Sequence, residues 1–428
     1  MHIEQTMDTK KITIIIVAIL GVGALIAGFF VYGLFLRKPE TPPVTLTMWA
    51  PEPESYYAGM FTRLKEAYPF VTMTYRAFTD AAQYERALLD ALAAGQGPDI
   101  FTVANNDLPR KLNKLFPLPA TMYTAERLQA EFPDTVLRDF TKNGTIYALP
   151  LYIDTLALVY NRDLLNEEGI AIPPSTWEEV QDMAGELAKY DDNGLVRAGI
   201  ALGGSHNIAH MKEIISALMF QNGAEMVNEG YSDAKFASLE GTNAFSFYMQ
   251  FARPSSAAYA WNDALGFSRD VFAAGRAAMV IETAEGKELI ARKSPFLNAG
   301  VAPLPQVDGQ KATYAVYRGL AVSRQSKNSR TAWGVVLAFA TNPAYAESYL
   351  GASGRPPALR ALVNKYLNDP AFGVFARQAL IGRAWAEPDP ERVTEIFADM
   401  AGKGLIGADA FATLKAAQDA VTSLMQTR

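Results

Sequence analysis

The sequence predicts an α/β fold built on a parallel sheet and preceded by one N-terminal transmembrane helix. Three observations support this prediction. Apolar runs typical of strands alternate with helix-like segments from residue 44 onward, residues 12–36 contain no charged side chain, and 428 residues are enough for two or three packed units. The chain is therefore expected to consist of a membrane anchor and a large folded region.

The expected anchor is the uncharged stretch at residues 12–36. At about 1.5 Å per residue, a helix of this length reaches roughly 38 Å and can cross a bilayer. The stretch exceeds the apolar core of a signal peptide and ends without a small-residue cleavage motif, so we expect it to stay uncleaved. Basic residues flank both ends and do not decide the orientation. Because only eleven residues precede the span and a large folded region follows it, we expect residues 1–11 to form a cytoplasmic tail and the folded region to lie on the extracytoplasmic side of the cell membrane. Residues 37–43, with three prolines, predict a short, stiff linker.

Composition excludes several classes of function. A net charge of −6 without a dense basic run argues against a nucleic-acid partner. The absence of cysteine removes disulfides, thiolate metal sites and cysteine nucleophiles. Of the three histidines, His206 and His210 are spaced to share a helical face, but no third ligand stands near them in the sequence. We therefore expect no metal and no cofactor.

Motifs of catalysis are also missing from the sequence. It contains no Gly-x-Ser-x-Gly, no phosphate-binding Gly-Lys-Ser/Thr loop and no His-Glu-x-x-His. Residues 191–194 resemble part of a calcium-binding loop, but such a loop needs an acid where Lys189 stands and a glutamate where Ile200 stands, so a turn before a strand is predicted. The protein is expected not to be an enzyme, although acidic residues meeting in a cleft leave a glycoside hydrolase open.

The first part of the folded region alternates regularly between strands and helices. Strands are expected at residues 44–49, 70–76 and 98–103, and helices at residues 57–68 and 84–94. In parallel sheets, ligands bind beyond the carboxyl ends of the strands. The polar and aromatic residues that end or follow the first and third strands are therefore candidates for ligand contact: Trp49, Glu52, Glu54, Asn105 and Asn106.

The central segment at residues 147–165 contains a buried strand. Its apolar, β-branched run at residues 156–160 predicts that strand, and Pro150 excludes a helix ahead of it. Two polar residues, Tyr152 and Asp154, stand in the loop between them.

Later segments continue the alternation. Thr176 and Glu179 predict a capping box that opens a helix, with Trp177 as a structural residue. The loop at residues 203–207 is expected to open another helix that ends near residue 222. Strands are expected at residues 199–202, 277–282 and 320–323, helices at residues 243–251, 267–275 and 330–340, and only helices with loops beyond residue 343.

Four stretches together resemble the extracellular solute-binding proteins of ABC importers, the family that includes maltose-binding and other sugar-binding proteins. These stretches are residues 93–100, 147–165, 174–179 and 272–279, and they occur in the family's order. The resemblance implies a two-lobed periplasmic-binding-protein-like fold with a hinge and an interlobe cleft. The lobes it implies are residues 44–149 plus 302–341 and residues 150–301 plus 342–428.

The resemblance also implies ligand-facing positions, among them those already found at the strand ends. The complete set of expected ligand-binding residues is Trp49, Glu52, Glu54, Asn105, Asn106, Tyr152, Asp154, His206, Asn207, Trp261, Tyr317, Arg318, Arg355 and Trp385. The tryptophans at positions 49, 261 and 385 are expected to stack on sugar rings, and the polar side chains to satisfy hydroxyl groups.

The function implied is that of a membrane-anchored receptor that captures a small solute, above all a mono- or oligosaccharide, and delivers it to ABC permease subunits. Two alternatives stay open: a sensor that signals through a membrane partner, and an anchored glycoside hydrolase. The ligand class also stays open, because acidic and aromatic side chains fit polyamines, whereas Arg318 and Arg355 fit an acidic sugar or a phosphate ester. Many family members carry a cleaved signal or a lipid-modified cysteine, and this chain departs from that pattern.

Overall fold

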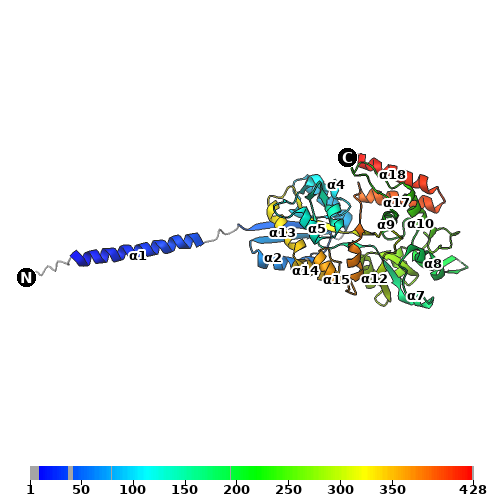
Figure 1. Ribbon diagram of the computed structural model, residues 1–428, viewed down its shortest axis with the longest axis horizontal. Helices are drawn as coiled ribbons and strands as arrows, with labels where there is room; N and C mark the ends of the chain where they lie inside the picture. Colours follow the sequence, from blue (N-terminus) through cyan, green and yellow to red (C-terminus); the bar gives the residue numbers. More distant parts are fainter. Residues whose placement is uncertain (1–8, 37–41, 79, 193, 427–428) are drawn as a thin grey trace, which may run out of the picture.

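The structure, a computed structural model, describes residues 9–36, 42–78, 80–192 and 194–426 (Figure 1). Helix α1 (Thr9–Leu36) stands apart from a two-lobed α/β body. In the described part of the chain, no helix meets both the length and the apolarity needed to cross a membrane. The first eight residues of the expected cytoplasmic tail and residues 37–41 of the expected linker lie outside the described residues.

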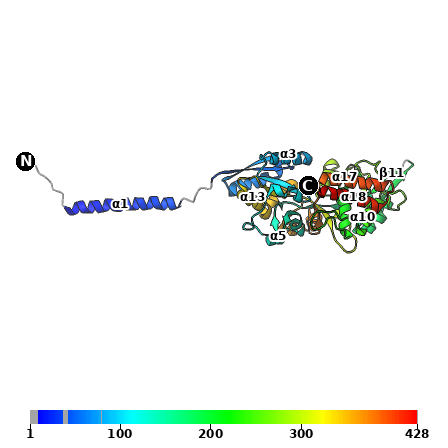
Figure 2. The same cartoon turned by 90° about the horizontal axis from the view of Figure 1, so that it is seen from above.

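The first sheet contains the predicted parallel strands. Its order is β2-β1-β3-β15-β4, and β1 runs parallel to both β2 and β3. Strand β15 joins antiparallel to β3 and also pairs with β7. Helices α2, α3 and α13 belong to the same lobe (Figure 2). The elements are β1 (Val44–Ala50), α2 (Ala58–Ala67), β2 (Val71–Ala77), α3 (Ala81–Ala93), β3 (Ile100–Ala104), β4 (Leu115–Phe116), β7 (Leu149–Pro150), β15 (Arg318–Ser323) and α13 (Ser329–Thr341).

The second sheet has the order β10-β11-β12-β9-β13. Strand β9 is the strand predicted in the central segment, and it runs antiparallel to β12 and β13. Every residue of β12 is buried, as expected for a central strand covered on both faces. The elements are β9 (Ala157–Asn161), α7 (Arg162–Glu167), α8 (Trp177–Leu187), β10 (Lys189–Asp191), β11 (Gly194–Ala201), α9 (Met211–Gln221), α10 (Leu239–Gln250), α11 (Ser268–Ala273), β12 (Ala277–Glu282), α12 (Ala284–Lys293) and β13 (Ala299–Pro303).

A small third sheet contains the two segments at which the chain passes between the large sheets, β8 between β7 and β9 and β14 between β13 and β15. Its order is β16-β14-β8, from β8 (Asp154–Thr155), β14 (Thr313–Val316) and β16 (Gly382–Arg383). Strand β14 runs antiparallel to β8 and parallel to β16. We call these strands the crossing sheet. Strand β16 corrects the expectation that only helices follow residue 343.

The two largest hydrophobic cores correspond to the two lobes. The first core contains side chains of the first sheet, such as Leu46 and Val103, and the second contains side chains of the second sheet, such as Val159 and Val280. Helices α14 (Pro343–Ser353) and α15 (Arg360–Tyr366) contribute to the first core, although the sequence assigned them to the second lobe. The reason is aromatic packing against the first lobe, because the Tyr349 ring centre lies 6.1 Å from that of Tyr56 and 5.2 Å from that of Tyr57. Helices α16 (Gly373–Ala379), α17 (Pro390–Leu405) and α18 (Ala410–Gln426) follow.

The start of helix α8 was predicted correctly from the sequence, and the start of helix α9 was not. The capping box of Thr176 and Glu179 is present at α8, and Trp177 is buried, as predicted. Helix α9, however, begins only at Met211, so His206 and His210 precede the helix and share no helical face. His210 adopts a left-handed backbone conformation with φ of 57°. No group of side chains able to hold a metal ion occurs in the described ranges.

Candidate ligand-binding site

A pocket of about 380 Å³ lies where side chains of both cores meet. We call it the interlobe pocket. Its walls come from the loops after β1 and β3, from the crossing sheet, and from the starts of α9 and α12. The lining residues are Pro51, Glu52, Ala81, Ala104, Asn105, Asn106, Tyr152, Glu213, Glu285, Tyr314, Val316, Tyr317, Arg318 and Arg355.

Glu52 provides a buried carboxylate in this pocket. It follows the end of β1 and is only 4% exposed. The Tyr57 hydroxyl donates a hydrogen bond to Glu52 Oε2 at 3.3 Å, and the Tyr75 hydroxyl donates to the Glu52 carbonyl at 2.7 Å. Burial raises the pKa of Glu52, while Arg355 and Arg318 act in the opposite direction. Because a carboxylate can accept several hydrogen bonds, the one from Tyr57 leaves Glu52 with capacity to accept others from a ligand.

Arg355 is held in a fixed orientation at the pocket wall. Its guanidinium lies 4.3 Å from the centre of the Tyr152 ring and donates to Glu285 Oε1 at 2.9 Å. The turn that places it begins at Gly354, whose φ of 68° ends α14. A stacked guanidinium with one donor engaged keeps further donors for a ligand, and it loses little freedom when it binds.

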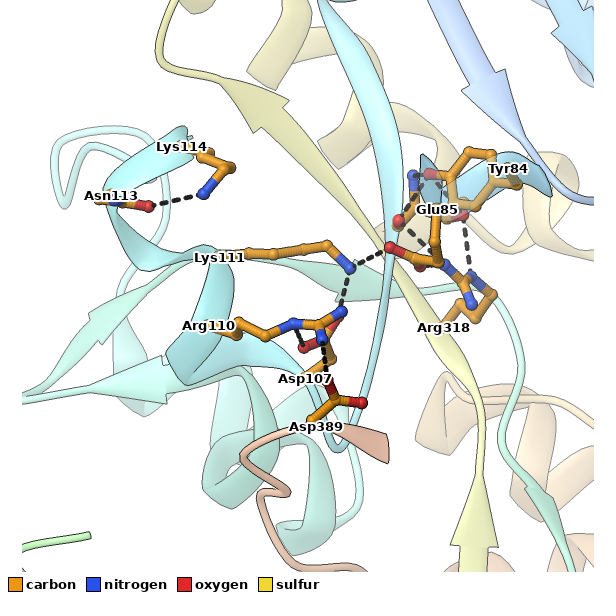
Figure 3. A network of polar contacts seen from close by, with 10 residues as sticks. Tyr84, Glu85, Asp107, Arg110, Lys111, Asn113, Lys114, Arg318 and Asp389 are labelled. Carbon is orange, nitrogen blue, oxygen red and sulfur yellow. Dashed lines mark hydrogen bonds and ion pairs between the residues drawn. The ribbon is translucent and has the colours of Figure 1, made fainter. Parts of the chain in front are cut away.

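Arg318 is oriented by neighbours behind the pocket wall (Figure 3). Its Nε donates to Thr102 Oγ1 at 3.0 Å, one terminal nitrogen donates to Glu85 Oε1 at 2.8 Å, and its guanidinium lies 5.1 Å from the Tyr84 ring centre. Burial raises the pKa of Glu85, but Lys111 and Arg318 outweigh it and hold the pKa below its usual value. Glu85 therefore stays ionised and fixes Arg318.

The same contacts continue away from the pocket as a row of alternating charges. Glu85 Oε2 accepts from Lys111 Nζ at 2.6 Å, and Lys111 also bonds to Asp107. Asp107 pairs with Arg110 at 2.9 Å, and Arg110 lies 3.6 Å from Asp389 of the other lobe (Figure 3). The row thus links a pocket residue to a contact between lobes.

The second lobe contributes a buried lysine and its carboxylate partners. Lys212 Nζ donates to both oxygens of Glu387, at 2.8 and 2.6 Å, and lies 3.2 Å from Glu213. The Tyr314 hydroxyl donates to Glu387 Oε1 at 3.0 Å. Burial raises the pKa of Glu213, but Lys212, His210 and the hydrogen bonds to the carboxylate together outweigh it, so the pKa lies below the usual value. The Glu387 amide also donates to the Asn106 carbonyl at 2.7 Å, which joins the two lobes.

Half of the expected site residues line the interlobe pocket. They are Glu52, Asn105, Asn106, Tyr152, Tyr317, Arg318 and Arg355. Asn105 and Tyr317 also have structural partners, because the Asn105 amide and the Tyr317 hydroxyl both donate to Asp139, at 3.1 and 2.6 Å.

The other expected residues lie elsewhere. Trp49 packs against Phe78, with the Arg76 guanidinium 4.5 Å from its ring centre. Glu54 and His206 are exposed and do not line the pocket. Trp261 is fully buried and donates to Asn207 Oδ1 at 3.0 Å.

Asn207 and Trp385 also have internal partners. The Asn207 amide donates to the carbonyls of Asn262 and Leu265, at 3.1 and 2.9 Å. Trp385 is 4% exposed, packs against Phe236, and lines a neighbouring pocket. None of the three expected tryptophan platforms therefore lines the interlobe pocket.

Three charged or aromatic lining residues were missed from the sequence: Glu213, Glu285 and Tyr314. Glu285 stands three residues beyond the end of β12, so the strand-end rule could have found it if applied to the second sheet. Glu213 and Tyr314 carried no such signal, because they lie in a helix and in a crossing strand.

Asp154 caps a helix. Its carboxylate accepts from the backbone N–H groups of Ala284 and Glu285, at 2.8 and 3.1 Å, at the start of α12. The residue is 2% exposed and does not line the interlobe pocket. Burial raises the pKa of Asp154 to about 6, although these two N–H groups act in the opposite direction.

Replacing Asp154 with asparagine is expected to flatten the pH dependence of stability. A carboxyl whose pKa is raised from 3.8 to about 6 binds its proton more tightly when folded, so the free energy of unfolding falls as pH rises between these values. The asparagine variant should lack this pH-dependent fall in the free energy of unfolding, which amounts to at most about 3 kcal/mol. Urea unfolding at pH 4 to 7 measures it, and the exposed Asp399→Asn variant should keep the wild-type slope.

Comparison with known proteins agrees with this architecture. A family model described as bacterial extracellular solute-binding protein matches residues 49–347. The chain belongs to this family. The maltotriose-binding protein of Pyrococcus abyssi is similar to the chain, with 25% identity over 363 residues, covering 82% of this chain and 75% of the relative. The mannitol-binding protein of Pseudomonas aeruginosa is 22% identical over 338 residues, covering 76% and 75%.

Solved structures of solute-binding proteins share the fold. A cyclo/maltodextrin-binding protein complexed with maltotetraose has a TM-score of 0.75 at 21% identity, covering 91% of this chain and 99% of that one. The cyclic alpha-maltosyl-1,6-maltose binding protein of Arthrobacter globiformis has a TM-score of 0.76 at 18% identity, covering 90% and 100%. The two-lobed α/β fold is therefore that of the solute-binding proteins.

Proposed function

We propose that the protein is the solute-binding receptor of an ABC importer and that its ligand is a mono- or oligosaccharide. The observation that carries the proposal is the interlobe pocket, where Glu52 and the Tyr152-stacked Arg355 offer an acceptor and donors that suit vicinal hydroxyl groups. Relatives named for maltotriose, mannitol and galactooligosaccharide binding support the ligand class. These relatives are named as binding proteins, which supports a role without catalysis.

The proposed mechanism is closure about a hinge. Glu52 and Arg355 lie beside the first core, whereas Glu213 and Glu285 belong to helices of the second lobe. A ligand that contacts both sides favours the state in which the lobes are closest. The crossing sheet provides the connections about which the lobes turn, and the permease subunits bind the closed state.

We also propose that residues 12–36 anchor the receptor in the cell membrane, with the lobes on the extracytoplasmic side. The support is the uncharged sequence of this stretch. A tether raises the concentration of the receptor beside its permease. After alkaline washing of membranes, the full chain should stay in the pellet and a chain beginning at residue 44 should be released. Release of both chains would rule out the anchor.

The ligand proposal is tested by binding measurements with maltotriose, mannitol and a galactooligosaccharide. At a hundred times its dissociation constant, a ligand should stabilise the protein by about 2.7 kcal/mol. We expect Glu52→Gln and Arg355→Gln to weaken binding at least about tenfold, the loss of one charge-assisted hydrogen bond. Glu54→Gln and Arg292→Gln, at exposed positions, serve as matched controls. If none of the sugars stabilises the protein, the proposed ligand class is wrong. If all variants bind sugar with equal affinity, the sugar does not bind at Glu52 and Arg355.

A further inference from the structure

A second pocket, larger than the first, borders the interlobe pocket. Its volume is about 690 Å³, and Asn105 lines both pockets. Its walls come from both cores, with Leu108 on one side and Phe220 and Trp385 on the other. The hydrogen bonds from Asn105 and Tyr317 to Asp139 lie between the two pockets. We call it the basic pocket, because Arg138, Lys142 and Arg383 line it.

Two guanidinium groups are held close together in the basic pocket. Arg138, on α6 (Asp134–Phe140), donates to the carbonyl of Gly382 at 2.9 Å, and this residue directly precedes Arg383. Arg383 donates to Gln310 Oε1 at 3.3 Å. Burial and the nearby Arg138 together lower the pKa of Arg383. Both side chains are therefore fixed by neutral acceptors while their charges repel each other.

The cations of the basic pocket have no direct carboxylate partner among the described residues. In the part of the chain that the structure describes, none of Arg138, Lys142 and Arg383 forms an ion pair within 4 Å. Asp139 lines the pocket, where burial raises its pKa to about 6 against the opposing effect of hydrogen bonds and of the Arg138 charge; its Oδ2 accepts hydrogen bonds from Tyr317 and Asn105.

The two remaining acids of the basic pocket are Glu225 and Glu229. Both are exposed and pair with none of the three cations. Exposed arginines are often simply solvated. Here, however, the exposed Arg138 and the partly buried Arg383 converge within one cavity and keep unused donors, which is the arrangement that binds anions bidentately.

We propose that the basic pocket is a second binding site, one that takes a small anionic solute through a phosphate or carboxylate group held by Arg138 and Arg383. The nearby Trp385 and Phe220 side chains offer apolar surface to the remainder of the solute. Arg138 belongs to α6 of the first lobe, and Arg383 belongs to the crossing sheet, so the bound anion ties these two parts together.

The test uses the full-length chain, with inorganic phosphate and citrate as probes and chloride at matched ionic strength as the reference. We expect saturable stabilisation by at least one probe, at least tenfold weaker binding in Arg138→Gln and Arg383→Gln, and none in the double variant. Arg292→Gln, an exposed arginine elsewhere, should bind as the wild type does. Response to phosphate alone or citrate alone identifies the anionic group.

Two results overturn the proposal: no saturable response to either anion, or an equal response in the single variants. If the double variant does not fold, Arg383→Lys replaces it, because a lysine keeps the charge but cannot bind bidentately and should weaken binding. Maltotriose binding at the interlobe pocket is measured in parallel. It should survive Arg138→Gln, so failure of the anion site and failure of the sugar site are distinguishable.

Discussion

Replacing Lys111 with methionine is expected to lower the free energy of unfolding by about 3 kcal/mol. The Lys111 side chain is fully buried, and its ammonium is shared by Glu85 and Asp107. Removing it leaves these carboxylates with excess negative charge in a poorly solvated place. Removing one partner of a buried ion pair usually costs about 3 to 5 kcal/mol of unfolding free energy. The Lys111 variant should lie near the low end, because Arg318 and Arg110 still pair with these carboxylates. Urea unfolding measures the change.

The matched control is Lys365→Met, at a pair with Glu347 that is far more exposed. Its expected cost is much smaller than that of the Lys111 variant, because water and salt screen an exposed ion pair. The Lys111 variant should also bind sugar more weakly. Without the Lys111 charge, Glu85 pairs with Arg318 alone, and this changes the electrostatic field around the Arg318 guanidinium at the pocket wall. If both lysine variants unfold alike, the row of alternating charges contributes no stability.

Replacing Trp261 with alanine is expected to destabilise the second lobe by about 3 to 5 kcal/mol. The indole is fully buried among second-core side chains, and its Nε1 donates to Asn207. The substitution creates a cavity and removes the hydrogen bond that Asn207 Oδ1 accepts, so both effects act in the same direction. The measurement is the free energy of unfolding in urea.

Trp49→Ala is the comparison for this variant, because Trp49 is only partly buried, and its cost should be smaller. Below its unfolding temperature, the Trp261 variant should bind maltotriose as the wild type does. Unchanged stability combined with lost sugar binding would instead restore the sequence-based expectation that this indole stacks on a sugar.

The regular start of the folded region was predictable from the sequence. Strands β1, β2 and β3 and helices α2 and α3 lie close to their expected positions, because strand-like apolar runs and helical segments contrast sharply there. The strand-end rule then found Glu52, Asn105 and Asn106, since parallel neighbouring strands bring these loops to one edge.

The roles of Asp154 and Trp261 could not be predicted, because their partners are distant in the sequence. Asp154 caps a helix 130 residues away, and Trp261 bonds to Asn207 across 54 residues. A polar residue after a strand and a tryptophan in a loop are compatible with either a ligand contact or an internal one. Only the folded chain distinguishes the two. The same reason explains why α14 and α15 were assigned to the wrong lobe.

The positions of four of the five tryptophans allow the protein's own fluorescence to report on its two lobes. Trp177 and Trp261 are enclosed in the second core and Trp333 in the first. The emission of each indole therefore follows the unfolding of the lobe that encloses it. Trp385 belongs to the second core but lines a pocket whose opposite wall is the first lobe. Its fluorescence should therefore change when the lobes move relative to each other, while that of the enclosed indoles stays constant. Rapid-mixing fluorescence could follow solute capture in this protein without any attached dye.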